Sequence, residues 1–308
     1  MRNHPVQFAV LLGVVLLVAC TPASPATVIE EIMSPSDSKP LVIAHRGARS
    51  LAPENTLAAA RKAHEIGADL WELDVAVTAD RELVIMHDDT LERTCNVAQV
   101  FPDRAPWQVW DFTLEEIQAL DCGSWFNASD PFGQIAAGNV SEADQQAYVG
   151  EQAPTLRAAL ELTRDNDWRV NIELKAQPNA ELDAVIIERV LALIEELDMG
   201  DGEQIVISSF NHDYLRAIRA QNAAIPLQAI TSQLIPDLPD YLAELGVQGC
   251  NPRWNVWSYA RLGELQTQGV SFNVWTVNDE LTMRALINTG VNGIITDYPQ
   301  TLLALLNE

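Results

Sequence analysis

From Leu41 to the end of the chain, short apolar runs alternate with segments of helical periodicity. This alternation predicts a parallel sheet whose strands are joined by helices, and runs this apolar fit strands that helices cover. The nine apolar runs span residues 41–45, 70–77, 83–87, 170–175, 204–210, 226–230, 247–250, 272–277 and 293–296. Helical patterns follow most of them, over residues 54–66, 113–120, 154–164, 180–198, 211–222, 237–245, 257–268, 279–289 and 299–307.

Nine strands are one more than a (β/α)8 barrel, also called a TIM barrel, requires. The gap between the runs at 70–77 and 83–87 is only five residues, whereas a parallel crossover takes about a dozen. We therefore predict a hairpin there, which leaves eight strands for the barrel. If the turn centres on Asp80, paired positions sum to about 160, and His87 comes to lie beside Glu72 and Asp74.

Polar side chains collect where such a barrel carries out chemistry, at the carboxyl ends of its strands. Charged groups inside apolar strands are costly unless they are paired or bind a metal. Those at or just inside the predicted strand ends are His45, Arg46, Glu72, Asp74, Glu173, Lys175, Ser209, Asn278 and Asp297.

Three of these residues form a candidate metal site. Glu72 and Asp74 are two positions apart and so share one face of their strand, and Glu173 alternates inward with Lys175 on another. Converging carboxylates repel one another, and a hard divalent cation offsets that repulsion. Ligands that are all oxygen indicate Ca²⁺ or Mg²⁺. The alternative is a set of structural salt bridges with Lys175 and the arginines at 46 and 49.

The charge of the chain limits its partners. It has 43 acidic and 19 basic residues, a formal net charge of −24. This balance argues against nucleic acid or anionic lipid as a partner held by bulk electrostatics. A metal or a cationic partner fits better, and a solvated acidic surface suited to a salty habitat is the other explanation.

The first residues indicate targeting. The apolar run 8–19 is too short to span about 30 Å of hydrocarbon but fits a signal-peptide core. It ends in Leu-Val-Ala-Cys, which resembles the lipobox of bacterial lipoproteins and implies cleavage before Cys20 and lipidation of that residue. We expect a signal peptide at 1–19, a tether at 20–40 and one domain at 41–308 in the bacterial cell envelope, with Thr21 favouring the outer membrane, facing the periplasm or the surface. The alternative is an ordinary signal peptide with a chance cysteine.

Three further cysteines permit one intramolecular bridge in an oxidising compartment. Cys95 and Cys122 are the expected pair because both lie in one loop-rich stretch. Cys250, in a strand-like run, is expected to be a small core residue.

The ordered motifs resemble the glycerophosphodiester phosphodiesterase family. The resemblance spans about residues 41–300 and, unlike His-Arg-Gly alone, the full set at these spacings is specific. The matching motifs are His45-Arg46-Gly47, Pro53-Glu54-Asn55-Thr56, Glu72-Leu73-Asp74, His87-Asp88, Leu91-Glu92-Arg93-Thr94, Asn171-Ile172-Glu173-Leu174-Lys175, Ser208-Ser209-Phe210, Trp275-Thr276-Val277-Asn278 and Thr296-Asp297-Tyr298-Pro299.

This resemblance implies a (β/α)8 barrel with a small insertion after the hairpin, and metal-dependent hydrolysis of glycerophosphodiesters, such as glycerophosphocholine and glycerophosphoethanolamine, to sn-glycerol 3-phosphate and an alcohol. It leaves open the preferred alcohol, the native metal, and the choice between direct attack by water and a cyclic phosphate. The implied roles are acid and base for His45 and His87, metal ligation for Glu72, Asp74 and Glu173, and phosphate contact for Arg46 and Lys175. Phe210 and Trp275 are candidates for packing on the glycerol carbons, or equally for the core.

Two features depart from the common family pattern. Residues 154–158 read Pro-Thr-Leu-Arg-Ala where the family often has Pro-Thr-Leu-Glu-Glu, which puts an accessory role for an acid there in doubt. The insertion at about 95–152 is long and rich in aromatic residues, so we expect it either to cover the mouth and shape the leaving-group pocket or to form a small structural cap.

Two other functions compete with this prediction. One is a related reaction on lysophospholipids or another phosphodiester, which would demand a wider and more apolar groove. The other is a binding protein without activity, which we would expect to have lost at least one of the two histidines or three carboxylates.

Overall fold

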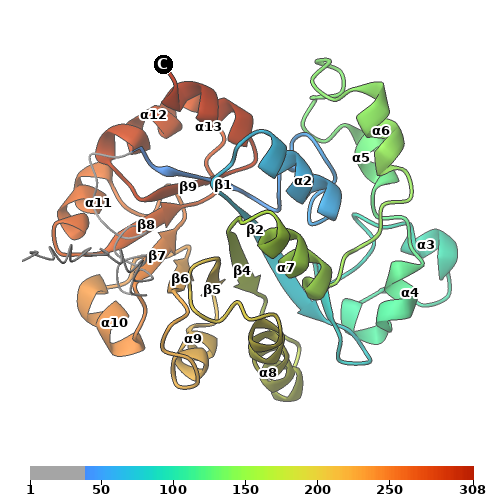
Figure 1. Cartoon of the computed structure of the whole chain (residues 1–308), viewed down its shortest axis with the longest axis horizontal. Helices are drawn as coiled ribbons and strands as arrows, with labels where there is room; N and C mark the ends of the chain where they lie inside the picture. The colour runs from blue at the N-terminus through green and yellow to red at the C-terminus, as the bar shows by residue number, and fades with distance from the viewer. Residues whose placement is uncertain (1–38) are drawn as a thin grey trace, which may run out of the picture.

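The computed structural model describes residues 39–308, and its centre is a closed barrel of eight parallel strands (Figure 1). Each strand pairs with its neighbour around the barrel, and β1 pairs with both β9 and β2, which closes it. The predicted (β/α)8 barrel is thus confirmed. Its strands are β1 Leu41–Ala44, β2 Leu70–Val77, β4 Val170–Leu174, β5 Ile205–Ser209, β6 Leu227–Thr231, β7 Gly249–Pro252, β8 Ser271–Val274 and β9 Gly293–Thr296.

The ninth strand forms the predicted hairpin. β3 (Leu83–Ile85) runs antiparallel to β2, with Val75 opposite Ile85 and Val77 opposite Leu83, so the paired positions sum to 160 as expected. The backbone N–H of Met86 donates to the carbonyl of Asp74 at 2.9 Å. This register places the following residue, His87, beside Leu73 and Asp74 of β2.

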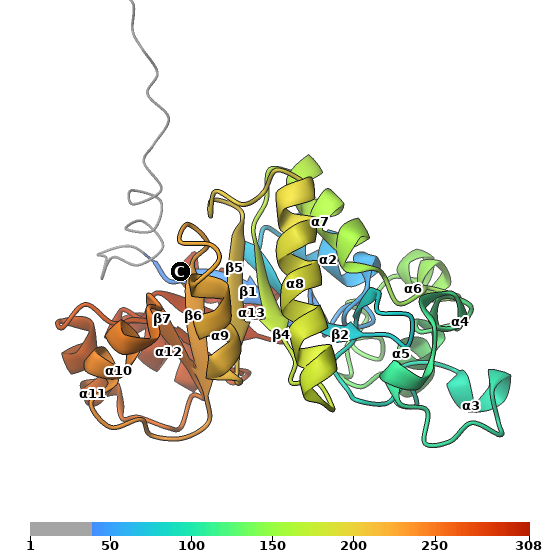
Figure 2. The same cartoon turned by 90° about the horizontal axis from the view of Figure 1, so that it is seen from below.

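A ring of helices covers the barrel (Figures 1 and 2). Several begin at a side chain that caps free backbone N–H groups: Thr56 accepts from Ala59, and Thr155 accepts from Ala158. The helices are α2 Leu57–Glu65, α7 Leu156–Asp165, α8 Ala180–Glu196, α9 His212–Arg219, α10 Leu238–Leu245, α11 Tyr259–Gln266, α12 Glu280–Thr289 and α13 Pro299–Leu306.

The insertion lies at one side of the barrel, beside α2 and β2 (right in Figures 1 and 2). Only its helix near 113–120 was predicted, because the others are too short to show a clear period. A Cys95–Cys122 disulfide joins its two halves, which confirms the expected pair. Its elements are α3 Val97–Val100, the 3-10 helix η1 Val109–Asp111, α4 Leu114–Gln118, α5 Ser124–Ser129 and α6 Glu142–Tyr148.

The aromatic residues of the insertion serve two purposes. Phe112 and Phe126 are fully buried, and Phe112 packs in a small core of its own with Val109 and Ile117, as expected of a structural cap. Phe132, by contrast, lies against the Arg49 guanidinium at 5.1 Å, next to the carboxyl end of the barrel. The insertion therefore packs on the hairpin through a second apolar core, which includes Ala76, Val84 and Met86, and it also reaches the mouth.

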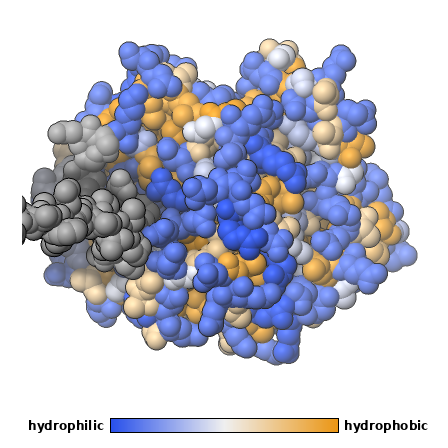
Figure 3. Space-filling model, viewed as in Figure 1, coloured by the Kyte–Doolittle hydropathy of each residue, from blue (hydrophilic) through white to orange (hydrophobic). Residues whose placement is uncertain are grey.

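The chain enters the barrel at the end opposite the mouth. β1 begins at Leu41, and the Lys39 amine donates to the carbonyl of Leu306 in the last helix. On the face shown in Figure 3, hydrophilic residues predominate and apolar ones form small groups. Within residues 39–308, no helix is long and apolar enough to cross a bilayer. Cys250 is buried in β7, as predicted.

Candidate active site

Three carboxylates converge at the carboxyl ends of β2 and β4. Asp74 and Glu173 are paired positions of these strands, and Glu72 lies two residues before Asp74 on the same face. One oxygen from each of the three lies within 4.8 Å of the others. The predicted convergence of Glu72, Asp74 and Glu173 is therefore present.

Burial and mutual repulsion set the charge of this cluster. Burial, followed by the charges of Asp74 and Glu173, raises the pKa of Glu72 well above its usual range, and burial with Asp74 also raises that of Glu173. Burial acts in the same direction on Asp74, but Arg46, His87 and Lys175 outweigh it and lower its pKa. The neighbouring cations therefore compensate only part of the repulsion among the three carboxylates.

The neighbouring cations reach only part of the cluster. Arg46 Nε lies 3.3 Å from Asp74 Oδ2, and Lys175 Nζ lies 3.3 Å from Glu173 Oε1 and 3.9 Å from Asp74 Oδ1. Glu72 Oε2 accepts the backbone N–H of Arg46, while its buried Oε1 has no hydrogen-bond partner. This unpaired oxygen and the all-oxygen donor set fit a hard divalent cation better than a set of salt bridges alone.

Each of the two histidines is held by a carboxylate. His45 Nδ1 lies 2.6 Å from Asp297 Oδ1, and His87 Nδ1 lies 2.6 Å from Asp88 Oδ1. A carboxylate that accepts from Nδ1–H leaves Nε2 as the nitrogen that can exchange a proton. His45 Nε2 lies 4.0 Å from Glu72 Oε2, so it faces the carboxylate cluster.

The environment of the first pair tunes both partners. Burial and then Arg46 lower the pKa of His45, against the opposing effect of Asp297. Despite its own burial, Asp297 keeps a pKa of about 2, because His45 and Arg49 stabilise its charge. Asn278 Nδ2 donates to the other oxygen of Asp297 at 2.7 Å and fixes the carboxylate.

Glu54 is the residue that sequence reasoning missed. It is 4% exposed, and its carboxylate accepts from Arg46 at 2.8 Å, from Arg49 at 2.6 Å and from Arg93 at 2.7 Å. These arginines hold the pKa of Glu54 far below its usual range. The sequence offered one signal, an acid in the Pro-Glu-Asn-Thr motif close to two arginines, but its partners are visible only in the fold.

The residues after β1 take an unusual backbone path. Arg46 and Gly47 have φ values of 55° and 77°, and a Cβ atom at Gly47 would lie 2.6 Å from the carbonyl carbon of Ala59. Only glycine fits this close approach to α2. The turn aims the Arg46 N–H at Glu72, so the His-Arg-Gly motif has a physical reason.

A pocket of about 90 Å³ opens beside the carboxylates. His45, His87 and Arg46 lie on it, as do Phe210, Ile230 and Trp275. The rings of Phe210 and Trp275 meet edge to face at 5.4 Å, and Phe210 is 47% exposed. Of the two predicted alternatives for these rings, a pocket wall fits better than the core.

Other predicted residues have structural contacts or lie outside the described residues. Ser209 Oγ donates to the carbonyl of Leu174 and accepts from the N–H of Asn211, so it stabilises a strand end. Cys20 precedes residue 39 and lies outside the described residues.

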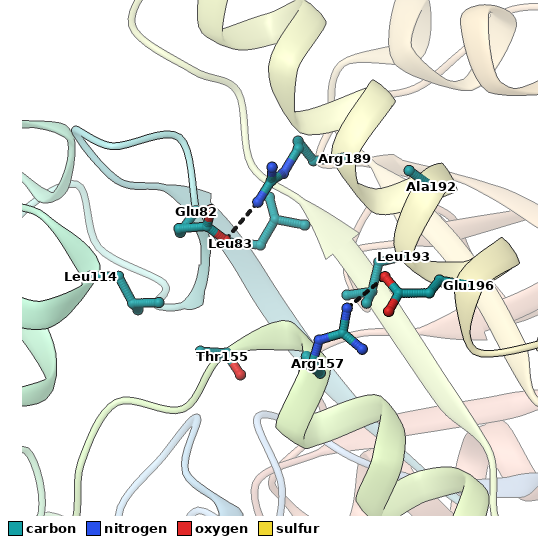
Figure 4. A pocket seen from close by; sticks show the side chains of 9 residues that line it. All are labelled: Glu82, Leu83, Leu114, Thr155, Arg157, Arg189, Ala192, Leu193 and Glu196. Carbon is teal, nitrogen blue, oxygen red and sulfur yellow. Dashed lines mark hydrogen bonds and ion pairs between the residues drawn. The ribbon is translucent and has the colours of Figure 1, made fainter.

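The departure at residues 154–158 lies on the outside of the barrel. A surface cavity of about 490 Å³ between the hairpin, α7 and α8 holds two arginines (Figure 4). Arg157 points toward Glu196 and Arg189 toward Glu82, each with a 2.6 Å ion pair. Because the charged side chains drawn there are paired with one another, this cavity offers no group for the reaction at the mouth.

The sequence matches the glycerophosphoryl diester phosphodiesterase family over residues 45–301. It is 35% identical to a glycerophosphodiester phosphodiesterase of Caldanaerobacter subterraneus subsp. tengcongensis over 88% of this chain and 99% of that protein.

Solved structures of phosphodiesterases are similar to this chain over most of its length. A phosphodiesterase of Oleispira antarctica, in complex with the product sn-glycerol-3-phosphate, aligns with a TM-score of 0.73 and 27% identity over 89% of this chain and 100% of that one. A glycerophosphodiester phosphodiesterase of Agrobacterium tumefaciens aligns with a TM-score of 0.65 and 26% identity over 86% and 99% of the two chains.

The contact between Asp297 and His45 predicts a change in the imidazole that is independent of any substrate. Asp297→Asn should lower the pKa of His45 further and disturb the Nδ1–H tautomer, because it removes the carboxylate that stabilises the protonated ring. Nitrogen NMR of the histidine rings across pH measures both effects. Asp213→Asn, in an exposed pair with Arg216, is the control. Unchanged His45 signals in Asp297→Asn would contradict the pairing.

Proposed function

The chain belongs to the glycerophosphoryl diester phosphodiesterase family and hydrolyses glycerophosphodiesters, and we propose that it does so with one divalent cation, Ca²⁺ or Mg²⁺, held by Glu72, Asp74 and Glu173, and with His45 and His87 as acid and base. One observation supports this most directly: both histidines, Glu72 and Glu173 line a single pocket, and Asp74 completes the cluster.

The products follow from the family and from a relative. The Oleispira antarctica phosphodiesterase holds the product sn-glycerol-3-phosphate. This supports sn-glycerol 3-phosphate and an alcohol as the products here, from substrates such as glycerophosphocholine or glycerophosphoethanolamine.

Arg46 and Lys175 would bind the phosphodiester, whose single negative charge grows on the oxygens that do not react as the transition state forms. Both are cations on the border of the carboxylate cluster. Glu54 fixes Arg46, so this guanidinium needs little reorganisation when charge develops, which is the condition for effective electrostatic stabilisation. A cation bound at the carboxylates would supply further positive charge to the same oxygens.

The two histidines would move the protons. One imidazole takes a proton from the attacking hydroxyl, and the other gives a proton to the departing alcohol. Asp297 and Asp88 hold the Nδ1 atoms, so Nε2 is the reactive nitrogen of each ring. The surroundings of the two rings differ: the His45 side chain is 13% exposed and faces Glu72, while the His87 side chain is 32% exposed and lies against Asp88.

The competing functions receive less support from the structure. A binding protein without activity would not need two imidazoles beside a cluster of three carboxylates. A lysophospholipid would need room for an acyl chain, whereas the pocket beside the carboxylates has only about 90 Å³.

We also propose that a lipid on Cys20 holds the protein in the bacterial cell envelope, at the outer membrane. The lipobox resemblance at residues 17–20 supports this, with a signal peptide at 1–19, a tether at 20–40 and the barrel domain at 41–308.

The anchor has a direct test. Cys20→Ser should move the protein from the membrane fraction to the soluble fraction, because it removes the lipidated thiol. Mass spectrometry of the mature amino terminus measures the modification itself. Recovery of Cys20→Ser in the membrane fraction in wild-type amounts would contradict the proposal.

The metal site predicts a metal-dependent release of sn-glycerol 3-phosphate from glycerophosphocholine. Chelator should abolish the release, and Ca²⁺ or Mg²⁺ should restore it. Glu72→Gln should raise the metal concentration for half-maximal activity by at least about 10-fold, since it removes one charged ligand. Glu65→Gln, on the exposed surface of α2, should leave the titration unchanged. Full activity in chelator would exclude the proposed cation.

The histidines give a second prediction. His45→Ala and His87→Ala should each lower kcat by about 10²–10⁴-fold, the usual contribution of general acid–base catalysis, without loss of fold. His64→Ala in α2 removes an exposed imidazole that lies edge-on to Trp168 and serves as the control. A wild-type rate in either of the first two variants would remove that histidine from the mechanism.

A further inference from the structure

The interior of this barrel is unusually polar on one side. Barrels of this kind are filled mainly by branched apolar side chains. Here five strands, from β4 to β8, carry buried polar side chains: Asn171, Ser208, Gln228, Asn251 and Asn273. Two glycines make room for such groups, because a Cβ at Gly249 would lie 2.2 Å from Ser271 Oγ, and one at Gly293 would lie 2.4 Å from Asn273 Oδ1.

Asn251 differs from the other amides of this set. It is 0% exposed, and neither its Nδ2 nor its Oδ1 has a hydrogen-bond partner among the described residues. Asn273, by comparison, donates its amide to Gln228 at 2.8 Å. An unpaired buried amide is destabilising, so a residue of this kind at a pocket indicates a partner that arrives with a ligand.

The position of Asn251 defines what it can contact. It lines the pocket that also holds His45 and Glu72, and its neighbours there are Ile230 and Trp275. The indole Nε1–H of Trp275 donates to the carbonyl of Asn251 at 2.7 Å, which fixes the ring beside the amide. The pocket therefore has a charged part at the carboxylates, where Asn171 with its unpaired Oδ1 also lies, and an apolar part around the Asn251 amide.

The size and chemistry of the apolar part select one portion of the substrate. About 90 Å³ lies well below the 300–1,000 Å³ of typical ligand pockets, so only a small fragment fits. A phosphate would bind at the cations, and a quaternary ammonium group has no N–H or O–H to share with an amide. A hydroxyl both donates and accepts, as the Asn251 amide does, and aliphatic carbons pack well against Phe210 and Trp275.

We propose that Asn251 binds a free hydroxyl of the glycerol moiety and so makes the enzyme selective for glycerophosphodiesters over esters of simpler alcohols. This inference rests on the proposed function, since it places the phosphate at the carboxylate cluster. Selectivity follows because a substrate without that hydroxyl leaves the buried amide unpaired. The free-energy cost of the unpaired amide discriminates between substrates more strongly than hydrophobic contacts do.

The test compares Asn251→Leu with wild type on three substrates: glycerophosphocholine and its two deoxy analogues, which lack the hydroxyl at carbon 1 or at carbon 2 of the glycerol. The variant should lose about 10- to 100-fold in kcat/KM on glycerophosphocholine. On one of the analogues, wild type and variant should have equal kcat/KM. Ser208→Ala removes a buried unpaired hydroxyl that does not line the pocket. This control should have the wild-type kcat/KM on all three substrates.

Stability separates this role from a structural one. Leucine replaces an unpaired amide with an apolar group of similar size, so the free energy of unfolding should be maintained or increased. Asn251→Ala provides a smaller side chain if leucine prevents folding. An equal loss on all three substrates, or no loss on any, would overturn the proposal.

Calorimetry provides a readout without turnover. With metal present, Asn251→Leu should bind sn-glycerol 3-phosphate about 10- to 100-fold more weakly than wild type and inorganic phosphate equally well. Absence of activity in the wild type would refute the proposed function, but the affinities for sn-glycerol 3-phosphate and inorganic phosphate would still test the role of Asn251. If Asn251→Leu left both affinities unchanged or reduced both equally, the proposal for Asn251 would be overturned.

Discussion

The repulsion among Glu72, Asp74 and Glu173 is the interaction around which the barrel mouth is arranged. Three carboxylates whose oxygens lie within 4.8 Å of each other, all largely removed from water, are very unfavourable by themselves. Arg46 and Lys175 offset part of this repulsion, and Asn55 Nδ2 donates to Asp74 at 2.9 Å. The repulsion that these groups do not offset is greatest at Glu72. A bound divalent cation would offset it.

Glu54 connects this cluster to the segment that leads into the insertion. The same carboxylate binds Arg46 beside the cluster and Arg93 just before the insertion, and Arg93 also pairs with Asp88, the partner of His87. The chain of contacts thus runs from the metal-ligand region to the second histidine through charged hydrogen bonds, which are the stronger kind. The insertion, closed by the Cys95–Cys122 disulfide, begins two residues after Arg93 and contacts Arg49 through Phe132.

The sequence predicted the features that depend on periodicity. The alternation of β2 placed Glu72 and Asp74 on one face, and the short gap around Asp80 determined the hairpin register that brings His87 to them. The resemblance to a family then suggested their roles, which the geometry supports but does not test. Glu54 and Asn251 could not be found in this way, because their significance lies in partners that are present or missing in three dimensions. The short helices of the insertion were missed because four to seven residues hold too little of a helical period.

The direction in which the chain enters the barrel bears on where substrate comes from. Leu41 starts β1 at the end opposite the mouth, where Lys39 contacts the last helix. A lipid on Cys20, joined to that closed end by 20 residues with a reach of roughly 70 Å at most, would attach the back of the barrel to the bilayer. The tether would then leave the mouth unobstructed for water-soluble diesters already stripped of their acyl chains.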